Sequence, residues 1–190
     1  MIIRLTFLLF ALFACSQCVF AQPEKSVNLK ENENSITLDN TYLYFMENRS
    51  MESFTPEKFD VKKLRFSILN NKIPNFGFIQ HDVWFYFIIN NQLSSAQTRF
   101  LSLNNPNLDI AELHFSDSTG RINSLDQGDL IAQNKHLINS RKIAFKLTLP
   151  AQSKREFYLR VNNGGEQFHF YPELQTHDRF FEHQYSKVDT

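Results

Sequence analysis

The chain has 190 residues, of which 42% are hydrophobic, and its 20 Lys and Arg balance 20 Asp and Glu. This length suits one domain, or one domain with appendages, and the hydrophobic content is enough for a packed core. The zero formal net charge excludes an electrostatic nucleic-acid binder, and only 5 Gly and 6 Pro exclude a low-complexity or fibrous protein.

Residues 1–21 have the pattern of an export signal. Arg4 supplies a positive charge, residues 5–14 form an apolar run, and residues 19–21 (VFA) resemble a cleavage site. The apolar run is too short to span a membrane comfortably. We therefore expect the chain to be exported and the signal to be cleaved after Ala21.

The two cysteines of the chain, Cys15 and Cys18, both lie in this signal segment. Cleavage after Ala21 would leave no disulfide, no thiolate nucleophile and no thiolate metal site. An alternative is lipidation at Cys15, because residues 12–15 (LFAC) resemble a bacterial lipoprotein signal.

Residues 22–34 are polar, charged and aperiodic, which is typical of a flexible linker. Ile36 and Leu38 then alternate with polar residues, which predicts a first strand near residue 35. The sequence Thr-Pro-Glu at 55–57 is typical of a helix N-terminus, so a short helix is expected over 55–63.

Three strands are expected in the middle of the chain. Residues 83–89 form an unbroken apolar run around Trp84, which favours a strand that is buried on both faces. Residues 99–103 and 108–116 form two further strands after polar breaks. Residues 117–120 (DSTG) then supply a turn in which glycine can take a positive φ.

The C-terminal half shows cleaner alternation. Period-2 patterns over 143–149, 157–161 and 168–170 predict half-buried strands, and residues 163–165 (NGG) are a strong hairpin signal between the last two. Residues 176–185 favour a short helix. Strands at such short spacing predict an all-β fold, an antiparallel sandwich over residues 35–175.

An ordered set of motifs runs through residues 36–174. They are the Trp84 strand, Asn105-Pro106, Leu108-Asp109, Asp117, Gly120, Gly128-Asp129, Arg141 and residues 158–161 (YLRV). In this order the motifs resemble the extracellular sensor domain of bacterial 7TMR-DISM receptors, which are seven-transmembrane receptors with diverse intracellular signalling modules. The domain they resemble is the second extracellular type, DISMED2. One departure is Tyr86, where the family tends to have Arg.

The resemblance implies a jelly roll like that of carbohydrate-binding modules, with one or two short helices. It implies a sensor on the periplasmic or extracellular side that binds a small ligand such as a carbohydrate. In a full receptor, residues 176–190 would lead to a membrane helix and tether the domain to the inner membrane. The resemblance also allows a homodimer. The alternative is a stand-alone secreted or lipid-anchored carbohydrate-binding protein.

The expected ligand face lies on the C-terminal strands. Tyr158, Arg160, His169 and Tyr171 fall opposite the apolar core positions, and they share one face if their strands pair through the glycine turn. Aromatic rings and polar donors of this kind suit a sugar. Ordinary cross-strand packing is the alternative. Tyr86 and Trp84 can either join the same face or lie in the core. For Trp84 the apolar run around it favours a structural place in the core.

Arg141 has the parity of inward-facing residues, so it has two interpretations. It can pair with Asp129 and fix the loop after Gly128, or it can grip a ligand carboxylate. Gly128 and Asp129 are therefore expected to be structural, and Arg141 remains a ligand-binding candidate. With Asp126, the same loop is a weak candidate for structural Ca²⁺.

The sequence has no convincing catalytic motif. The six His show no HExxH spacing, and no G-x-S-x-G segment is present. Scattered Asp and Glu leave a glycan-acting enzyme as a weaker alternative. We therefore expect no enzyme activity, no cofactor and no metal.

Overall fold

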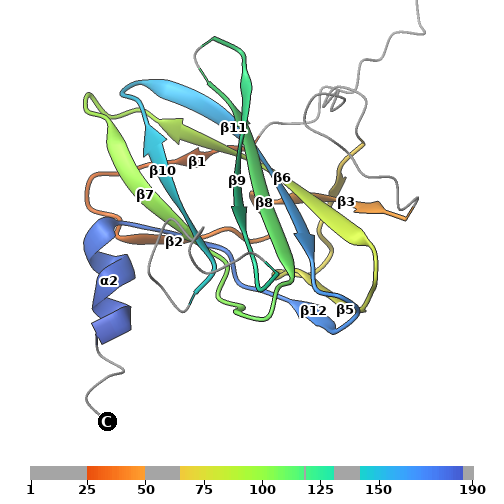
Figure 1. Cartoon of the computed structure of the whole chain (residues 1–190). Helices are drawn as coiled ribbons and strands as arrows, with labels where there is room; N and C mark the ends of the chain where they lie inside the picture. The colour runs from red at the N-terminus through yellow and green to blue at the C-terminus, as the bar shows by residue number, and fades with distance from the viewer. Residues whose placement is uncertain (1–24, 50–64, 118, 131–141, 186–190) are drawn as a thin grey trace, which may run out of the picture.

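The computed structural model of the chain describes residues 25–49, 65–117, 119–130 and 142–185. It is an all-β sandwich of two main sheets with a helix, α2 (His177–Tyr185), packed beside it (Figure 1). The predicted signal at 1–21, the predicted helix over 55–63 and Arg141 lie outside the described residues.

The larger sheet contains the strands with the most apolar sequences. Its strand order is β4-β3-β6-β11-β8-β9, and the short strand β1 joins β6 in parallel while all other neighbours are antiparallel. The strands are β1 (Val27–Asn28), β3 (Tyr44–Asn48), β4 (Ser67–Ile68), β6 (Asp82–Asn91), β8 (Ile110–Ser116), β9 (Ile122–Gln127) and β11 (Ser153–Asn162).

The second sheet has the order β10-β7-β13-β2, and a two-stranded sheet of β12 and β5 lies at one end of the sandwich (Figure 1). Successive strands from β6 to β8 change sheets, as a jelly roll requires. The strands are β2 (Ser35–Thr37), β5 (Asn75–Phe78), β7 (Gln97–Ser102), β10 (Ala144–Leu149), β12 (Gln167–His169) and β13 (Glu173–Gln175).

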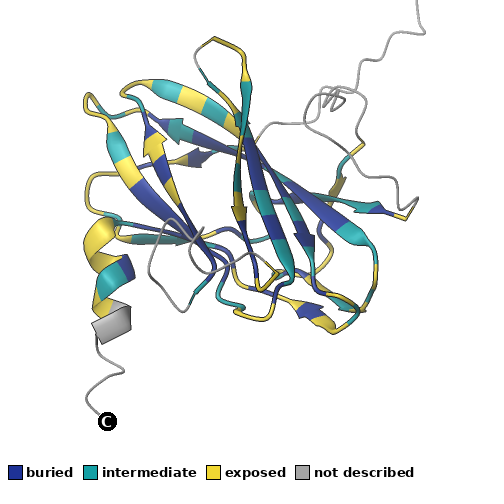
Figure 2. Ribbon diagram, viewed as in Figure 1, coloured by how far each residue is buried: buried dark blue, intermediate teal, exposed yellow. Residues whose placement is uncertain are grey.

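Strand β6 is buried on both faces, which confirms the interpretation of its unbroken apolar run (Figure 2). Phe85 and Phe87 belong to the core between the sheets. Trp84 and Ile88 have the opposite parity, yet they are 1% and 0% exposed. Trp84 is therefore buried as expected, but on the outer face of the sheet and not in the core between the sheets.

The segment expected to be a flexible linker contributes to the sandwich. Val27 and Leu29 are buried in the core, and β1 pairs with β6 at Ile89 and Asn90. The expectation failed because two apolar side chains in a polar segment give no periodicity to recognise, although they are enough to fill one end of the core.

The helix α2 covers the outer side of the second sheet. The ring of Phe180 stacks on that of Phe100 in β7, with centroids 4.7 Å apart, and the backbone N–H of Arg179 donates to the hydroxyl of Thr176. This confirms the helix predicted over 176–185. In the described part of the chain, no helix is both long and apolar enough to cross a membrane.

The turn predicted at 117–120 is present, and the carboxylate of Asp117 holds it together. This carboxylate accepts hydrogen bonds from the Thr119 hydroxyl at 2.6 Å and from the backbone N–H of Thr119 and Arg121 at 2.8 and 3.1 Å. The Asn123 amide adds a fourth at 3.2 Å. Gly120 takes a φ of +82°.

We expect the carboxyl of Asp117 to titrate far below its ordinary range. Hydrogen bonds from the Thr119 and Asn123 side chains, then from backbone N–H groups, lower its pKa from 3.8 to about 2. Because the folded pKa is depressed, the stability it contributes is present above pH 3.8 and is lost as the pH falls towards 2. A ¹³C NMR titration measures this midpoint. A midpoint at 3.8 would show that the carboxylate does not hold the turn.

Candidate functional site

The outer face of the larger sheet brings two rows of side chains together. In one row, Tyr44, Tyr86 and Tyr158 lie opposite one another on β3, β6 and β11. In the next row, Arg160 on β11 lies between Trp84 on β6 and Glu112 on β8. Period-2 alternation places these side chains on the face opposite the core.

The tyrosine row (Tyr44, Tyr86 and Tyr158) is a packed aromatic surface. The rings of Tyr86 and Tyr158 have centroids 5.1 Å apart, and Phe66 lies 5.5 Å from Tyr86. Tyr158 is 8% exposed and its hydroxyl donates to Glu156 at 2.9 Å, whereas Tyr86 and Phe66 are half-buried. The accessible part of this surface is therefore formed by Tyr86 and Phe66.

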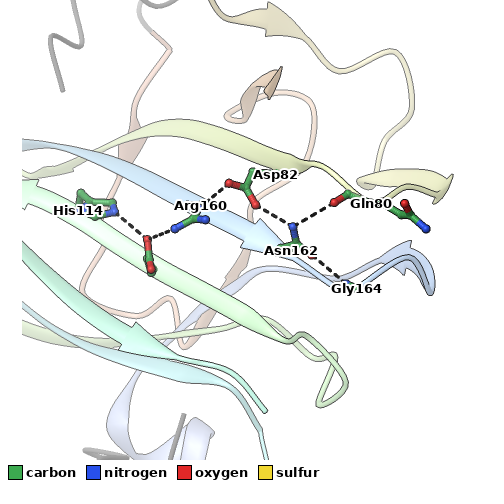
Figure 3. Close-up of polar contacts among 7 residues, drawn as sticks. Gln80, Asp82, His114, Arg160, Asn162 and Gly164 are labelled. Carbon is green, nitrogen blue, oxygen red and sulfur yellow. Dashed lines mark hydrogen bonds and ion pairs between the residues drawn. The ribbon is translucent and has the colours of Figure 1, made fainter. Parts of the chain in front are cut away.

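The arginine cluster (Asp82, Glu112 and Arg160) lies beside the tyrosine row. Nε of Arg160 donates to Oδ2 of Asp82 at 2.7 Å, and Nη1 donates to Oε2 of Glu112 at 2.9 Å (Figure 3). The three side chains are 14% to 26% exposed. They come from neighbouring strands β6, β11 and β8, so the sheet itself fixes their separation.

The pKa values show how strongly these charges depend on one another. Hydrogen bonding to His114, opposed by burial and assisted by Arg160, lowers the pKa of Glu112. Burial lowers the pKa of Arg160, but its bonds to Asp82 and Glu112 outweigh this and raise it overall. Glu112 and Arg160 therefore stabilise each other's charged forms within the cluster.

Asn162 extends the cluster to the turn that follows β11. Its amide donates to Oδ1 of Asp82 at 2.8 Å, and its side-chain oxygen accepts from the backbone N–H of Gly164 at 2.8 Å (Figure 3). Gly164 has a φ of +61°, and a Cβ there would overlap the carboxylate of Asp109. The cluster is thus tied to a turn that only glycine fits well.

His114 lies next to the cluster, on the same face of β8. Its ring stacks on Trp84 with centroids 5.4 Å apart, and Nε2 lies 3.6 Å from Oε2 of Glu112. We did not single out His114, Glu112 or Asp82 from the sequence. The sequence feature that could have identified two of them is the alternation in residues 110–116, which gives Glu112 and His114 the same parity.

The predicted ligand residues fall into two groups. Tyr86, Tyr158 and Arg160 lie together on the outer face, as expected. His169 and Tyr171 do not share that face, because β11 pairs with β6 and β8 whereas β12 pairs with β5. The prediction of one four-residue face is therefore wrong for these two exposed residues.

Of the two loop residues that were expected to be structural, Gly128 is required by the conformation of the backbone. Gly128 has a φ of +127°, and a Cβ there would overlap the backbone of Asp109, so the position requires glycine. Asp129 is exposed, and its backbone N–H donates to the carbonyl of Leu108 at 2.8 Å. The pairing of Asp129 with Arg141 involves a residue outside the described part of the chain.

The described residues contain no set of side chains that could bind a metal ion. No group of three or more His, Cys, Asp and Glu side chains there is arranged to hold a metal ion, and this includes the loop with Asp126 and Asp129.

A comparison with family models places this chain in a known group. The model described as 7TMR-DISM extracellular 2 matches residues 38–176, which is most of the chain. A comparison with curated proteins found no match. The match confirms the resemblance and supports an extracellular or periplasmic sensor domain of a membrane receptor. The chain belongs to the 7TMR-DISM extracellular 2 family.

Proposed function

We propose that this sensor domain binds a small carbohydrate on the outer face of its larger sheet, between the tyrosine row and the arginine cluster. One observation carries the proposal. Tyr158 and Arg160 are two residues apart on β11, so an aromatic surface and a fixed set of charges lie side by side. Binding modules for sugars use this combination of ring platforms and directional polar groups.

Two polar atoms of the arginine cluster can form hydrogen bonds with a ligand. Arg160 donates through Nε and Nη1, and within the described residues its Nη2 has no acceptor. Likewise, Oε2 of Glu112 is used and Oε1 has no donor in that part of the chain. A sugar hydroxyl both donates and accepts, so it can bridge these two atoms, while a pyranose ring packs on Tyr86 and Phe66.

We also propose that the domain does no covalent chemistry on its ligand. A glycan-hydrolysing pair needs one carboxyl that stays protonated to act as a general acid. Glu112 has a lowered pKa and binds Arg160, so it remains an acceptor. Asp82 is likewise held by Arg160 and Asn162.

The role of such binding is to shift a conformational equilibrium in the receptor. A ligand changes that equilibrium only if its affinity differs between the two states. The outer face suits this requirement because its polar side chains bridge three strands, so a ligand that contacts Arg160 also contacts the strands that hold Asp82 and Glu112.

A thermal-shift screen against sugars tests the proposal, because a ligand that binds only the folded state raises the melting temperature. We expect Tyr86→Ala to weaken binding of any active sugar at least tenfold, since it removes the accessible ring of the tyrosine row. The matched control is Tyr171→Ala, which removes a 46% exposed tyrosine elsewhere and should leave binding unchanged. Equal effects of the two substitutions would refute the proposed face.

A further inference from the structure

Arg99 in β7 is a buried arginine that is not part of the outer face of the larger sheet. It is 5% exposed and lies directly opposite Leu147 of β10. Leu147 and Leu101 belong to the core between the sheets, and Arg99 has their parity. The guanidinium therefore belongs to the inner side of the second sheet, near the end where β7 begins.

The partners of Arg99 are neutral. Nη1 donates to the side-chain oxygen of Gln97 and to the carbonyl of Thr98, both at 3.1 Å. Within the described residues, no carboxylate forms an ion pair with it. Burial alone lowers the pKa of Arg99. A buried cation without a counter-charge is costly, so a fold that keeps one has an unused capacity for an anion.

The free edge of the guanidinium is the one that carries Nε and Nη2. Neither atom has an acceptor in the described part of the chain. Neither is among the polar atoms of the described residues that are both sealed from solvent and without a partner, so this edge of Arg99 keeps some contact with solvent. Gln97 and Thr98 hold the opposite side, which fixes the orientation of the plane.

We propose that Arg99 is a binding site for a small monocarboxylate, which its Nε and Nη2 grip in a bidentate manner. The planar fork of a guanidinium matches the two oxygens of a carboxylate. A single negative charge balances the single charge of Arg99 beside Leu147, whereas a dianion such as phosphate would leave an excess charge in apolar surroundings. The site lies on the other sheet from the proposed sugar face and goes beyond that function.

The competing explanation is that Arg99 only lays its aliphatic stem on the core and needs no ligand. The two explanations differ in what the Nε–H group experiences. A purely structural arginine is insensitive to the kind of anion in solution. A binding site distinguishes acetate from chloride at equal ionic strength.

The test is a titration of the purified protein with sodium acetate against sodium chloride at constant ionic strength, observed at the arginine Nε–H signals by NMR. We expect the Arg99 signal to move saturably with acetate and not with chloride, and the melting temperature to rise with acetate. In Arg99→Lys, which keeps the charge but loses the fork, the acetate-dependent rise in melting temperature should require at least tenfold more acetate. Arg121→Lys, at an exposed site, should leave it unchanged.

Each other outcome counts against the site. No saturable movement of the wild-type Arg99 signal would overturn it, and this reading holds even if Arg99→Lys fails to fold. An unchanged acetate response in a folded Arg99→Lys protein would also overturn it. Tighter binding of inorganic phosphate than of acetate would overturn the assignment to a monocarboxylate.

Discussion

Phe168→Ala is expected to lower the free energy of unfolding by about 3–5 kcal/mol, because it leaves a cavity that surrounding rings cannot collapse to fill. Phe168 is 0% exposed. Its ring centroid lies 5.4 Å from that of Phe76 and 5.7 Å from that of Phe170. Urea unfolding followed by the fluorescence of Trp84, the single tryptophan, measures the loss.

The matched control for Phe168 is Phe78, which lies on β5 in the same two-stranded sheet but is 80% exposed. Phe78→Ala should change the free energy of unfolding by less than about 0.5 kcal/mol. If the two substitutions lower the free energy of unfolding equally, the two-stranded sheet does not close the core in the way the structure shows.

Arg160→Met is the second substitution with a large expected effect. It should lower the free energy of unfolding by about 3 kcal/mol at pH 7, because it leaves Asp82 and Glu112 partly buried without their shared cation. Both carboxylates lie within 2.9 Å of the guanidinium in the wild type. Urea unfolding at pH 7 measures the loss, with Arg121→Met at an exposed site as the control.

The pH dependence of this loss distinguishes charge from packing. In the wild type, the folded pKa of Glu112 is lowered, so its stabilising contribution is present above 4.5 and is lost as the pH falls through the folded pKa. In Arg160→Met the two carboxylates repel each other, so protonation of Glu112 at low pH reduces this repulsion and stabilises the variant. The difference between the two proteins should therefore shrink from pH 7 to about 3. A difference that stays constant would mean that Arg160 acts only by packing.

The strands with strong local patterns were predictable. Residues 143–149 alternate cleanly and form β10 (Ala144–Leu149), and the apolar run at 83–89 lies inside β6 (Asp82–Asn91). Alternation and composition determine which face of a strand is buried, and these properties are local. The same logic located Phe168 and Phe170 in the core.

Strand pairing was less predictable, because it depends on edges that distant segments compete for. Residues 163–165 do form a turn, with φ of +61° and +96° at Gly164 and Gly165. The strands on either side of it do not pair, since β6 and β8 already occupy both edges of β11. His169 and Tyr171 were therefore assigned to the wrong face.

The candidate site shows the same division. Tyr158 and Arg160 were predicted from parity within their own strand, whereas the sequence left Tyr86 open between this face and the core. Asp82 and Glu112, the partners of Arg160, lie 78 and 48 residues away in the sequence, and only the register between β6, β11 and β8 brings them to it. No pattern within one strand contains that information.

The measurement that tests the central claim most directly is an NMR titration of the ¹⁵N-labelled protein with D-glucose, D-galactose, N-acetyl-D-glucosamine and L-rhamnose. The account predicts saturable shifts for at least one sugar, concentrated on the outer face around Tyr86, Glu112 and Arg160. Shifts centred instead on His169 and Tyr171, or no saturable shift with any of the sugars, would contradict it.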